Sequence, residues 1–82
     1  MSKKSYWLIV ETIGRHLEMR MRSQHDAIEV AHAFMDLETD ATRITVVSRA
    51  HNKRTGGKKA FEWVHAGMLG WVELEEEYRA LN

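Results

Sequence analysis

The feature that most constrains this chain is an unbroken alternation of polar and apolar side chains near the N-terminus. Residues 16–22 read His-Leu-Glu-Met-Arg-Met-Arg, so every second side chain is apolar. Successive side chains of a strand point to opposite faces, and this period of two therefore predicts a half-buried strand. Residues 5–12 are β-branched and aromatic, which also favours a strand. Because Gly14 between the two runs tolerates positive φ, residues 5–22 are predicted to form a β-hairpin.

A helix is predicted directly after this hairpin. Ser23 is a preferred N-cap residue, and Asp26 follows at the position of the acid in a capping box. Apolar residues then recur at helical spacing, while the opposite side of the segment is acidic. We expect a helix over residues 24–37, and its apolar stripe comprises Ala27, Ile28, Ala31, Phe34, Met35 and Leu37.

The second half of the chain is predicted to form another hairpin over residues 43–65. Residues 43–50 are rich in β-branched side chains, and a strand pattern resumes at residues 60–64. The stretch between them, residues 51–59, is polar, basic and contains two glycines. These properties indicate a long basic tip that joins the two strands.

The C-terminal segment is compatible with two structures. Trp71, Leu74, Tyr78 and Leu81 recur at helical spacing, which favours a helix over residues 71–81. The sequence Trp-Val-Glu-Leu at its start is equally compatible with a short fifth strand.

These elements predict a single small domain over residues 1–82 of the α+β class. It has an antiparallel sheet of about four strands in the order ββαββ, with one helix packed on one face. A domain of this size buries only roughly 60% of its unfolded surface. The absence of cysteine excludes disulfides, thiolate metal sites and cysteine nucleophiles. With no apolar run long enough to span a membrane, we expect a cytoplasmic location.

The net charge of zero conceals a segregated distribution. Twelve Lys and Arg balance twelve Asp and Glu. The local charge nevertheless changes sign along the chain, from +3 over residues 1–22 to −5 over 24–40, +6 over 43–59 and −4 over 60–82. Neutrality therefore excludes only indiscriminate binding of polyanions, because a chain of this kind can present faces of one sign that steer partners.

Basic side chains are predicted to gather on the sheet face that the helix leaves bare and on the hairpin tip. If the second and third strands turn these sides outward, Arg20 and Arg22 lie beside Arg43 and Arg49. A cationic hairpin tip can reach phosphates or an acidic protein groove. The predicted partner-binding residues are Arg20, Arg22, Arg43, Arg49, Lys53, Arg54, Lys58 and Lys59, and a second candidate face consists of Asp26, Glu29 and Asp36.

The aromatic residues are expected mainly in the core of so small a chain. Tyr6 and Trp7 are neighbours in a predicted strand, so one of them faces outward unless the C-terminal segment covers it. An outward tryptophan would mark a contact surface.

Catalysis and metal binding have little support in the sequence. His25 and His32 are seven residues apart on the predicted helix, without the closer spacing and further ligand of a zinc site. The run Gly56-Gly57-Lys58 lacks the spacing of a phosphate-binding loop. We therefore expect no enzymatic activity, no cofactor and no metal site.

Residues 3–49 resemble the phage T7-type inhibitors of bacterial RNA polymerase. The similarity consists of Lys-Lys-Ser-Tyr-Trp at residues 3–7, the helix start at residues 23–31 and Ile-Thr-Val at residues 44–46. That family inhibits through arginines on the strand after the helix, where the matching positions here are Val46 and Ser48. The ββαββ order and the late tryptophan strand are also similar to small anti-CRISPR proteins, which bind nuclease complexes at their nucleic-acid sites.

Both resemblances imply a small phage-encoded protein that binds and inhibits host machinery. The expected function is non-enzymatic binding to a protein of the host's nucleic-acid machinery, with arginine as a bidentate partner of carboxylates. Direct DNA or RNA binding through the basic residues 43–59 is the first alternative. A homodimeric module that pairs exposed strand edges is the second.

Overall fold

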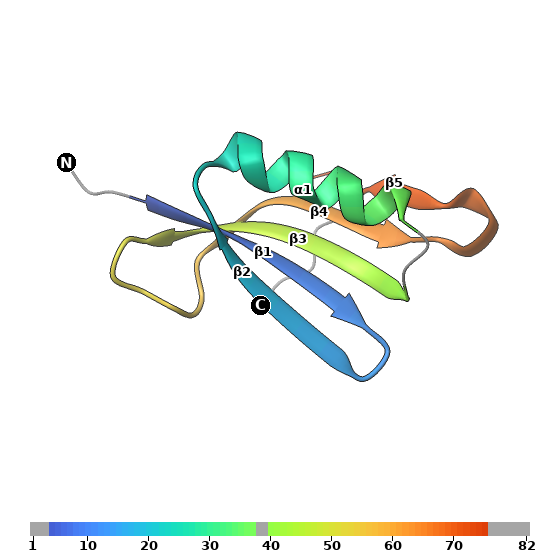
Figure 1. Cartoon of the computed structure of the whole chain (residues 1–82), viewed down its shortest axis with the longest axis horizontal. Helices are drawn as coiled ribbons and strands as arrows, with labels where there is room; N and C mark the ends of the chain where they lie inside the picture. The colour runs from blue at the N-terminus through green and yellow to red at the C-terminus, as the bar shows by residue number, and fades with distance from the viewer. Residues whose placement is uncertain (1–3, 38–39, 76–82) are drawn as a thin grey trace.

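A five-stranded antiparallel sheet with one helix on one face is the architecture of the chain (Figure 1). The computed structural model describes residues 4–37 and 40–75. The sheet order is β2-β1-β3-β4-β5, which confirms the predicted α+β class and ββαββ arrangement. The elements are β1 (Lys4–Thr12), β2 (Arg15–Met21), α1 (Gln24–Asp36), β3 (Ala41–Ala50), β4 (Lys58–His65), the 3-10 helix η1 (Gly67–Leu69) and β5 (Trp71–Glu73).

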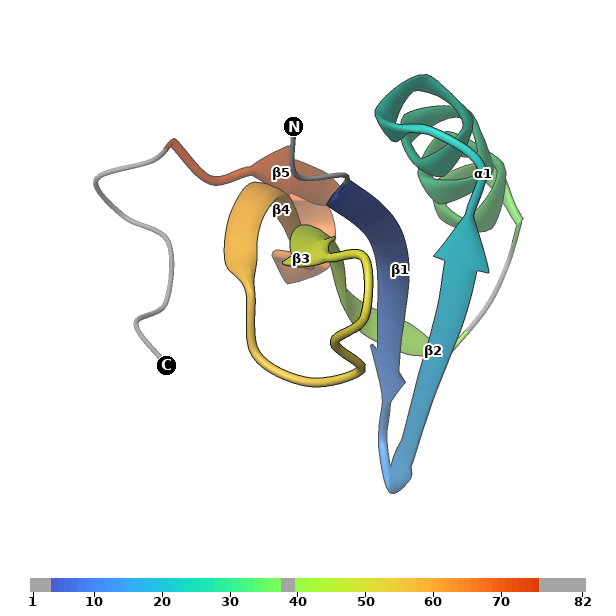
Figure 2. The same cartoon turned by 90° about the vertical axis from the view of Figure 1, so that its left-hand side faces the viewer.

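The first hairpin has the predicted strands and turn. Tyr6 lies opposite Met21 and Thr12 lies opposite Arg15, so only two residues connect β1 to β2. One of them, Gly14, has a φ of 80°, a conformation that other residues adopt at a steric cost. The tip of the hairpin points away from α1, as Figures 1 and 2 show.

Helix α1 begins where the sequence predicts. The Ser23 hydroxyl accepts a hydrogen bond of 3.1 Å from the backbone N–H of Asp26, which satisfies one of the free donors of the first turn. Ala27 and Ala31 are fully buried, as expected for the apolar stripe. Leu37 was expected in this stripe but is 63% exposed, because the chain has already left the helix there with an extended backbone.

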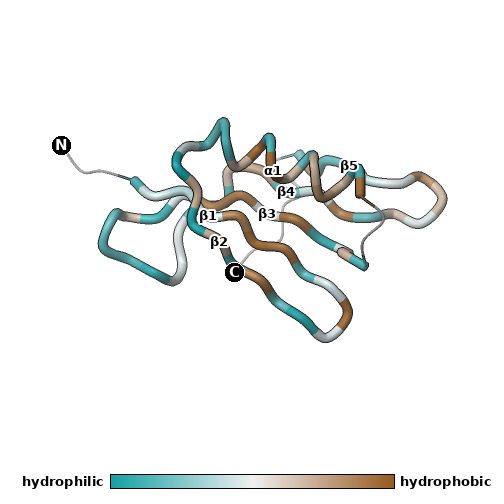
Figure 3. The backbone as a smooth tube through the Cα atoms, viewed as in Figure 1, coloured by the Kyte–Doolittle hydropathy of each residue, from teal (hydrophilic) through white to brown (hydrophobic). Residues whose placement is uncertain are grey.

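The core lies between α1 and the central strands. Leu8, Ile44 and Val46 are completely buried against the two alanines of the helix. Small helix residues let the helix lie close to the sheet, so the aliphatic side chains of β1 and β3 fill the remaining space. Figure 3 shows the hydrophobic stretches along these two strands.

The predicted second hairpin is confirmed, but the loop between its two strands is shorter than predicted. Strand β4 already begins at Lys58, so Lys58 and Lys59 belong to the strand and the loop comprises residues 51–57. In Figure 1 this loop lies at the left end of the sheet, near the N-terminus of β1.

The prediction of a helix over residues 71–81 is wrong for residues 71–73. Residues Trp71–Glu73 form strand β5, so the short-strand alternative is confirmed there, while residues 76–81 lie outside the described part. Gly70, with a φ of 73°, turns the chain back onto β4, and Trp71 then lies opposite His65. The Trp71 and His65 rings make an edge contact with centroids 5.4 Å apart. Strand pairing and this ring contact override the local helical spacing.

Alanine at Gly57 should destabilise the protein more than alanine at Gly56. Both residues have positive φ, 98° and 74°. A Cβ on Gly57 would overlap the Ser48 carbonyl oxygen and lie 2.7 Å from Arg49 Cγ, whereas a Cβ on Gly56 meets nothing within 4 Å. We expect Gly56→Ala to cost about 1 kcal/mol and Gly57→Ala about 2–3 kcal/mol, as measured by urea unfolding. Equal costs would contradict this close approach of the loop to β3.

Candidate functional site

The sheet face opposite to α1 carries a layer of ion pairs. Arg43 Nη1 lies 2.9 Å from Glu62 Oε2, and Arg43 Nε lies 3.7 Å from Glu11 Oε2. Glu62 is completely buried, and Lys59 Nζ approaches the same carboxylate at 3.6 Å. A buried carboxylate requires such compensation. Arg43 and Lys59, both predicted as partner-binding residues, therefore neutralise Glu62 within the fold.

Arg49 connects three parts of the molecule from a nearly buried position. Its Nη1 donates to Glu18 Oε1 at 2.9 Å, and its Nε donates to the Gly56 carbonyl oxygen at 2.9 Å. Its guanidinium carbon also lies 5.1 Å from the centroid of the Trp7 ring, within range of a cation–π interaction. Because Arg49 is only 6% exposed, it holds β2, β1 and the loop 51–57 together instead of presenting its charge to a partner.

The carboxylate that holds Arg49 is itself fixed by hydrogen bonds. His16 Nε2 lies 2.7 Å from Glu18 Oε2. The hydrogen bond with His16, followed by that with Arg49, lowers the pKa of Glu18 below its ordinary value. Glu18 therefore stays ionised at neutral pH as the partner of Arg49.

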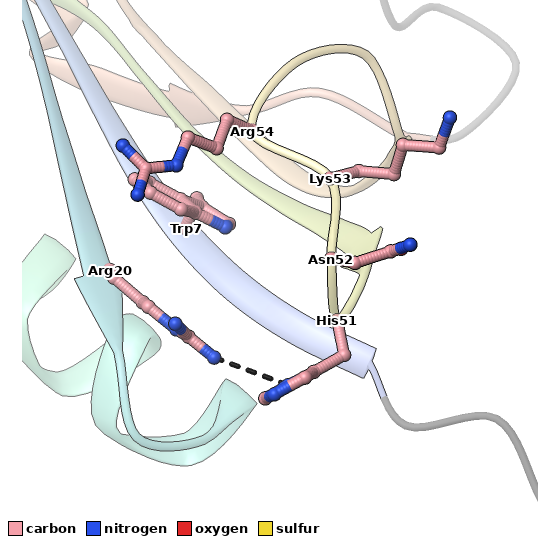
Figure 4. Close-up of a pocket in the computed structure, with 6 residues that line it drawn as sticks. All are labelled: Trp7, Arg20, His51, Asn52, Lys53 and Arg54. Carbon is pink, nitrogen blue, oxygen red and sulfur yellow. Dashed lines mark hydrogen bonds between the residues drawn. The ribbon is translucent and has the colours of Figure 1, made fainter.

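Beyond Arg49, toward the loop 51–57, no carboxylate of the described residues lines the pocket in the sheet face. There a pocket of about 470 Å³ opens between β1, β2 and the loop (Figure 4). By contrast, a pocket at the centre of the face has both Glu11 and Glu18 in its wall. The residues that line the basic pocket are Trp7, Arg20, His51, Asn52, Lys53 and Arg54.

Arg20 is held in this basic pocket by two contacts. Its Nη2 donates to the buried Ser5 hydroxyl at 3.1 Å and lies 3.2 Å from His51 Nδ1, the contact dashed in Figure 4. A guanidinium can only donate, so His51 Nδ1 accepts and the ring proton resides on Nε2. The histidine thus contributes a further N–H donor at the basic pocket.

Trp7 supplies the aromatic surface of the basic pocket. It is half-buried, and its Nε1 is enclosed without a hydrogen-bond partner among the described residues. The Arg54 side chain points from the loop toward Trp7 (Figure 4). Tyr6 and Trp7 are neighbours in a strand, and this position predicted from the sequence that one of the two aromatic side chains faces outward. Nothing in the sequence indicated that His51 and Asn52 would belong to the site.

The structure places seven of the eight predicted basic residues in two groups and leaves Arg22 apart from both. Arg43, Arg49 and Lys59 belong to the ion-paired face, as described above. Lys58 is exposed at the start of β4, and Arg22 is exposed between β2 and α1. Arg20, Lys53 and Arg54 line the basic pocket, and we call these three residues together with Lys58 the basic end.

The predicted acidic face lies on α1, across the sheet from the basic end. Asp26 is half-buried in the first turn, where its N–H bonds to Ser23. Glu29 and Asp36 are exposed, and Glu29 Oε1 lies 2.9 Å from His25 Nε2. Within residues 4–37 and 40–75, no three His, Asp or Glu side chains gather as metal ligands.

Comparisons with protein-family models, curated proteins and solved structures found no match to the chain. The resemblances to phage inhibitors therefore stay predictions. In the part of the chain that the structure describes, no helix is long and apolar enough to cross a membrane.

Proposed function

We propose that this is a small, non-enzymatic, phage-encoded protein that inhibits a component of the host's nucleic-acid machinery, either RNA polymerase or a defence nuclease complex. It acts in the cytoplasm of the infected bacterium and docks through the basic end. One observation carries the proposal: acidic side chains offset the cations along the sheet face, but among residues 4–37 and 40–75 none lines the pocket at the basic end.

The basic end suits an acidic surface of a partner protein. Lys53, Arg54 and Lys58 are exposed, and arginine can bind a carboxylate through two parallel hydrogen bonds. The bond between Arg49 and the Gly56 carbonyl anchors the loop that carries two of these cations. Because the loop is already anchored, less conformational entropy is lost when a partner binds.

Capture from bacterial lysate tests this proposal when the lysate is first treated with nuclease, so that nucleic acid cannot bridge two proteins. We expect the wild-type chain to retain a polymerase or nuclease subunit and to inhibit its activity when both are purified. Arg54→Glu combined with Lys58→Glu should reduce capture and inhibition at least tenfold. Arg15→Glu, which reverses an exposed arginine at the other end of β2, is the matched control and should behave as wild type.

The proposal is wrong if both variants retain the same proteins as the wild type, or if the retained protein is not inhibited. Light scattering on the same samples tests the homodimer alternative. A species of twice the chain mass of 9.6 kDa would support pairing of strand edges.

A further inference from the structure

We propose that the basic pocket binds one nucleotide unit of a single-stranded nucleic acid. The base would stack on Trp7, and the phosphate would lie among Arg20, Lys53 and Arg54. This inference goes beyond the proposed function and shares with it only the basic end as the binding surface.

The aromatic part of the argument concerns Trp7. Single-strand binding proteins combine cationic grooves with aromatic side chains on which bases stack. Trp7 lines the basic pocket while most other large aromatic surface lies elsewhere: Trp63 is buried in the core, and Trp71 pairs with His65 beside β4. Within the fold, Trp7 contacts the Arg49 guanidinium carbon, 5.1 Å from its ring centroid, and it also lines the basic pocket beside Arg20, Lys53 and Arg54.

The electrostatic part concerns the lining of the basic pocket. Arg20, Lys53 and Arg54 bring three positive charges, and no carboxylate from the described part of the chain lines the pocket to offset them. The hydrogen bonds to Ser5 and His51 fix Arg20 in place before any ligand arrives. A preorganised cluster of cations favours an anion with several acceptor oxygens, and a phosphate provides them.

The volume of the basic pocket and the polar groups that line it suit a whole nucleotide better than a phosphate alone. The volume of about 470 Å³ lies within the range of small-ligand sites. Asn52 offers both donors and an acceptor, and His51 offers its Nε2 proton, so the edge of a base can be hydrogen-bonded. A base inside a duplex is already stacked between its neighbours, whereas a single strand can present one to Trp7.

Binding should depend on salt, but less steeply than for a large basic surface. One phosphate neutralised in the basic pocket of a single strand's complex predicts a slope of log affinity against log salt of about −0.7. The zero net charge of the chain fits this modest electrostatic component.

The experiment uses fluorescence anisotropy with a labelled oligothymidylate of about 12 nucleotides, a length within the site sizes of single-strand binders. Wild type should bind, and Trp7→Ala should bind roughly five- to 150-fold more weakly because stacking is lost. Trp7→Phe keeps an aromatic ring and should recover most of the affinity. Arg54→Ala should weaken binding and bring the salt slope closer to zero, while Arg15→Ala should leave both affinity and slope unchanged.

Three results would overturn the inference. The first is no binding at the lowest salt, and the second is equal affinity of wild type and Trp7→Ala when circular dichroism shows both folded. The third is equal or tighter binding of a duplex of the same sequence. Competition by thymidine monophosphate should be weaker than by the unlabelled strand, and tighter binding of the monophosphate would point to a free nucleotide instead.

The outcome is independent of the lysate experiment, which removes nucleic acid. If the oligonucleotide does not bind but a host protein is still captured through Arg54 and Lys58, the nucleotide site fails and the proposed function stands. If the oligonucleotide binds through Trp7 and no protein is captured, the protein partner fails and direct nucleic-acid binding replaces it.

Discussion

Replacing Arg49 by methionine is expected to lower the free energy of unfolding by about 2–4 kcal/mol. Methionine keeps much of the side-chain volume but removes the hydrogen bonds to Glu18 and Gly56 and the cation over Trp7. The Glu18 side chain is one-third exposed, so water can hydrate its carboxylate once Arg49 is replaced. The loss of stability is therefore smaller than for a fully buried carboxylate that loses its partner. The same substitution should weaken every activity of the basic end, because the loop 51–57 loses its anchor.

Urea unfolding followed by far-ultraviolet circular dichroism measures this cost. Arg49→Lys keeps the positive charge but not the planar fork that reaches Glu18 and Gly56 together, so it should fall between wild type and Arg49→Met. Arg15→Met removes an exposed arginine of β2 and should change stability by no more than about 0.5 kcal/mol. If Arg49→Met is as stable as Arg15→Met, the anchoring role of Arg49 is refuted.

The second large effect is expected at the pair formed by Arg43 and Glu62. Arg43→Met should cost about 3 kcal/mol, because it leaves the completely buried Glu62 carboxylate with less compensation. The value lies at the low end for a broken buried pair, since Lys59 still approaches the same oxygen. Glu62→Leu in the Arg43→Met background should recover part of this loss, because the charge that needed compensation is gone.

A double-mutant cycle measures this coupling directly. We expect the costs of Arg43→Met and Glu62→Leu to sum to at least about 1 kcal/mol more than the cost of the double variant. Additive costs would mean that the two side chains do not depend on each other. The matched control combines Arg15→Met with Glu62→Leu, and their costs should be additive because β1 and β3 lie between the strands that carry them.

Local periodicity explains why the elements could be predicted from the sequence. The alternation in residues 16–22 and the cap at Ser23 are properties of neighbouring residues. The strand and the helix that they predict have bounds within one residue of the predicted ones. Trp71 shows the limit of this reasoning. Its helical spacing to Leu74 was genuine, but β4 offered an edge to which residues 71–73 could pair, and no local pattern reveals an available edge.

The role of each arginine depended on strand register, which the sequence does not contain. Charge is segregated along the chain, yet the sheet brings Glu18 from a basic segment next to Arg49 and sets Arg43 opposite Glu11. The predicted set of eight therefore mixed residues that stabilise the sheet with residues that are exposed to solvent. Trp7 is absent from the predicted set for the same reason. Only the pairing of β1 with β2 and β3 places its side chain beside Arg20 and the loop 51–57.

The position of β1 between β2 and β3 also determines when the basic pocket can exist during folding. β1 pairs with β2 through a two-residue turn, but its other neighbour is separated from it by the whole of β2 and α1, so that Trp7 lies opposite Val47. Closing so long a loop is slow compared with forming a local hairpin. Because the basic pocket takes side chains from β1, β2 and the loop after β3, a chain that has formed only its first hairpin and helix lacks this pocket. The basic pocket should therefore form in a late step, when β3 joins the sheet.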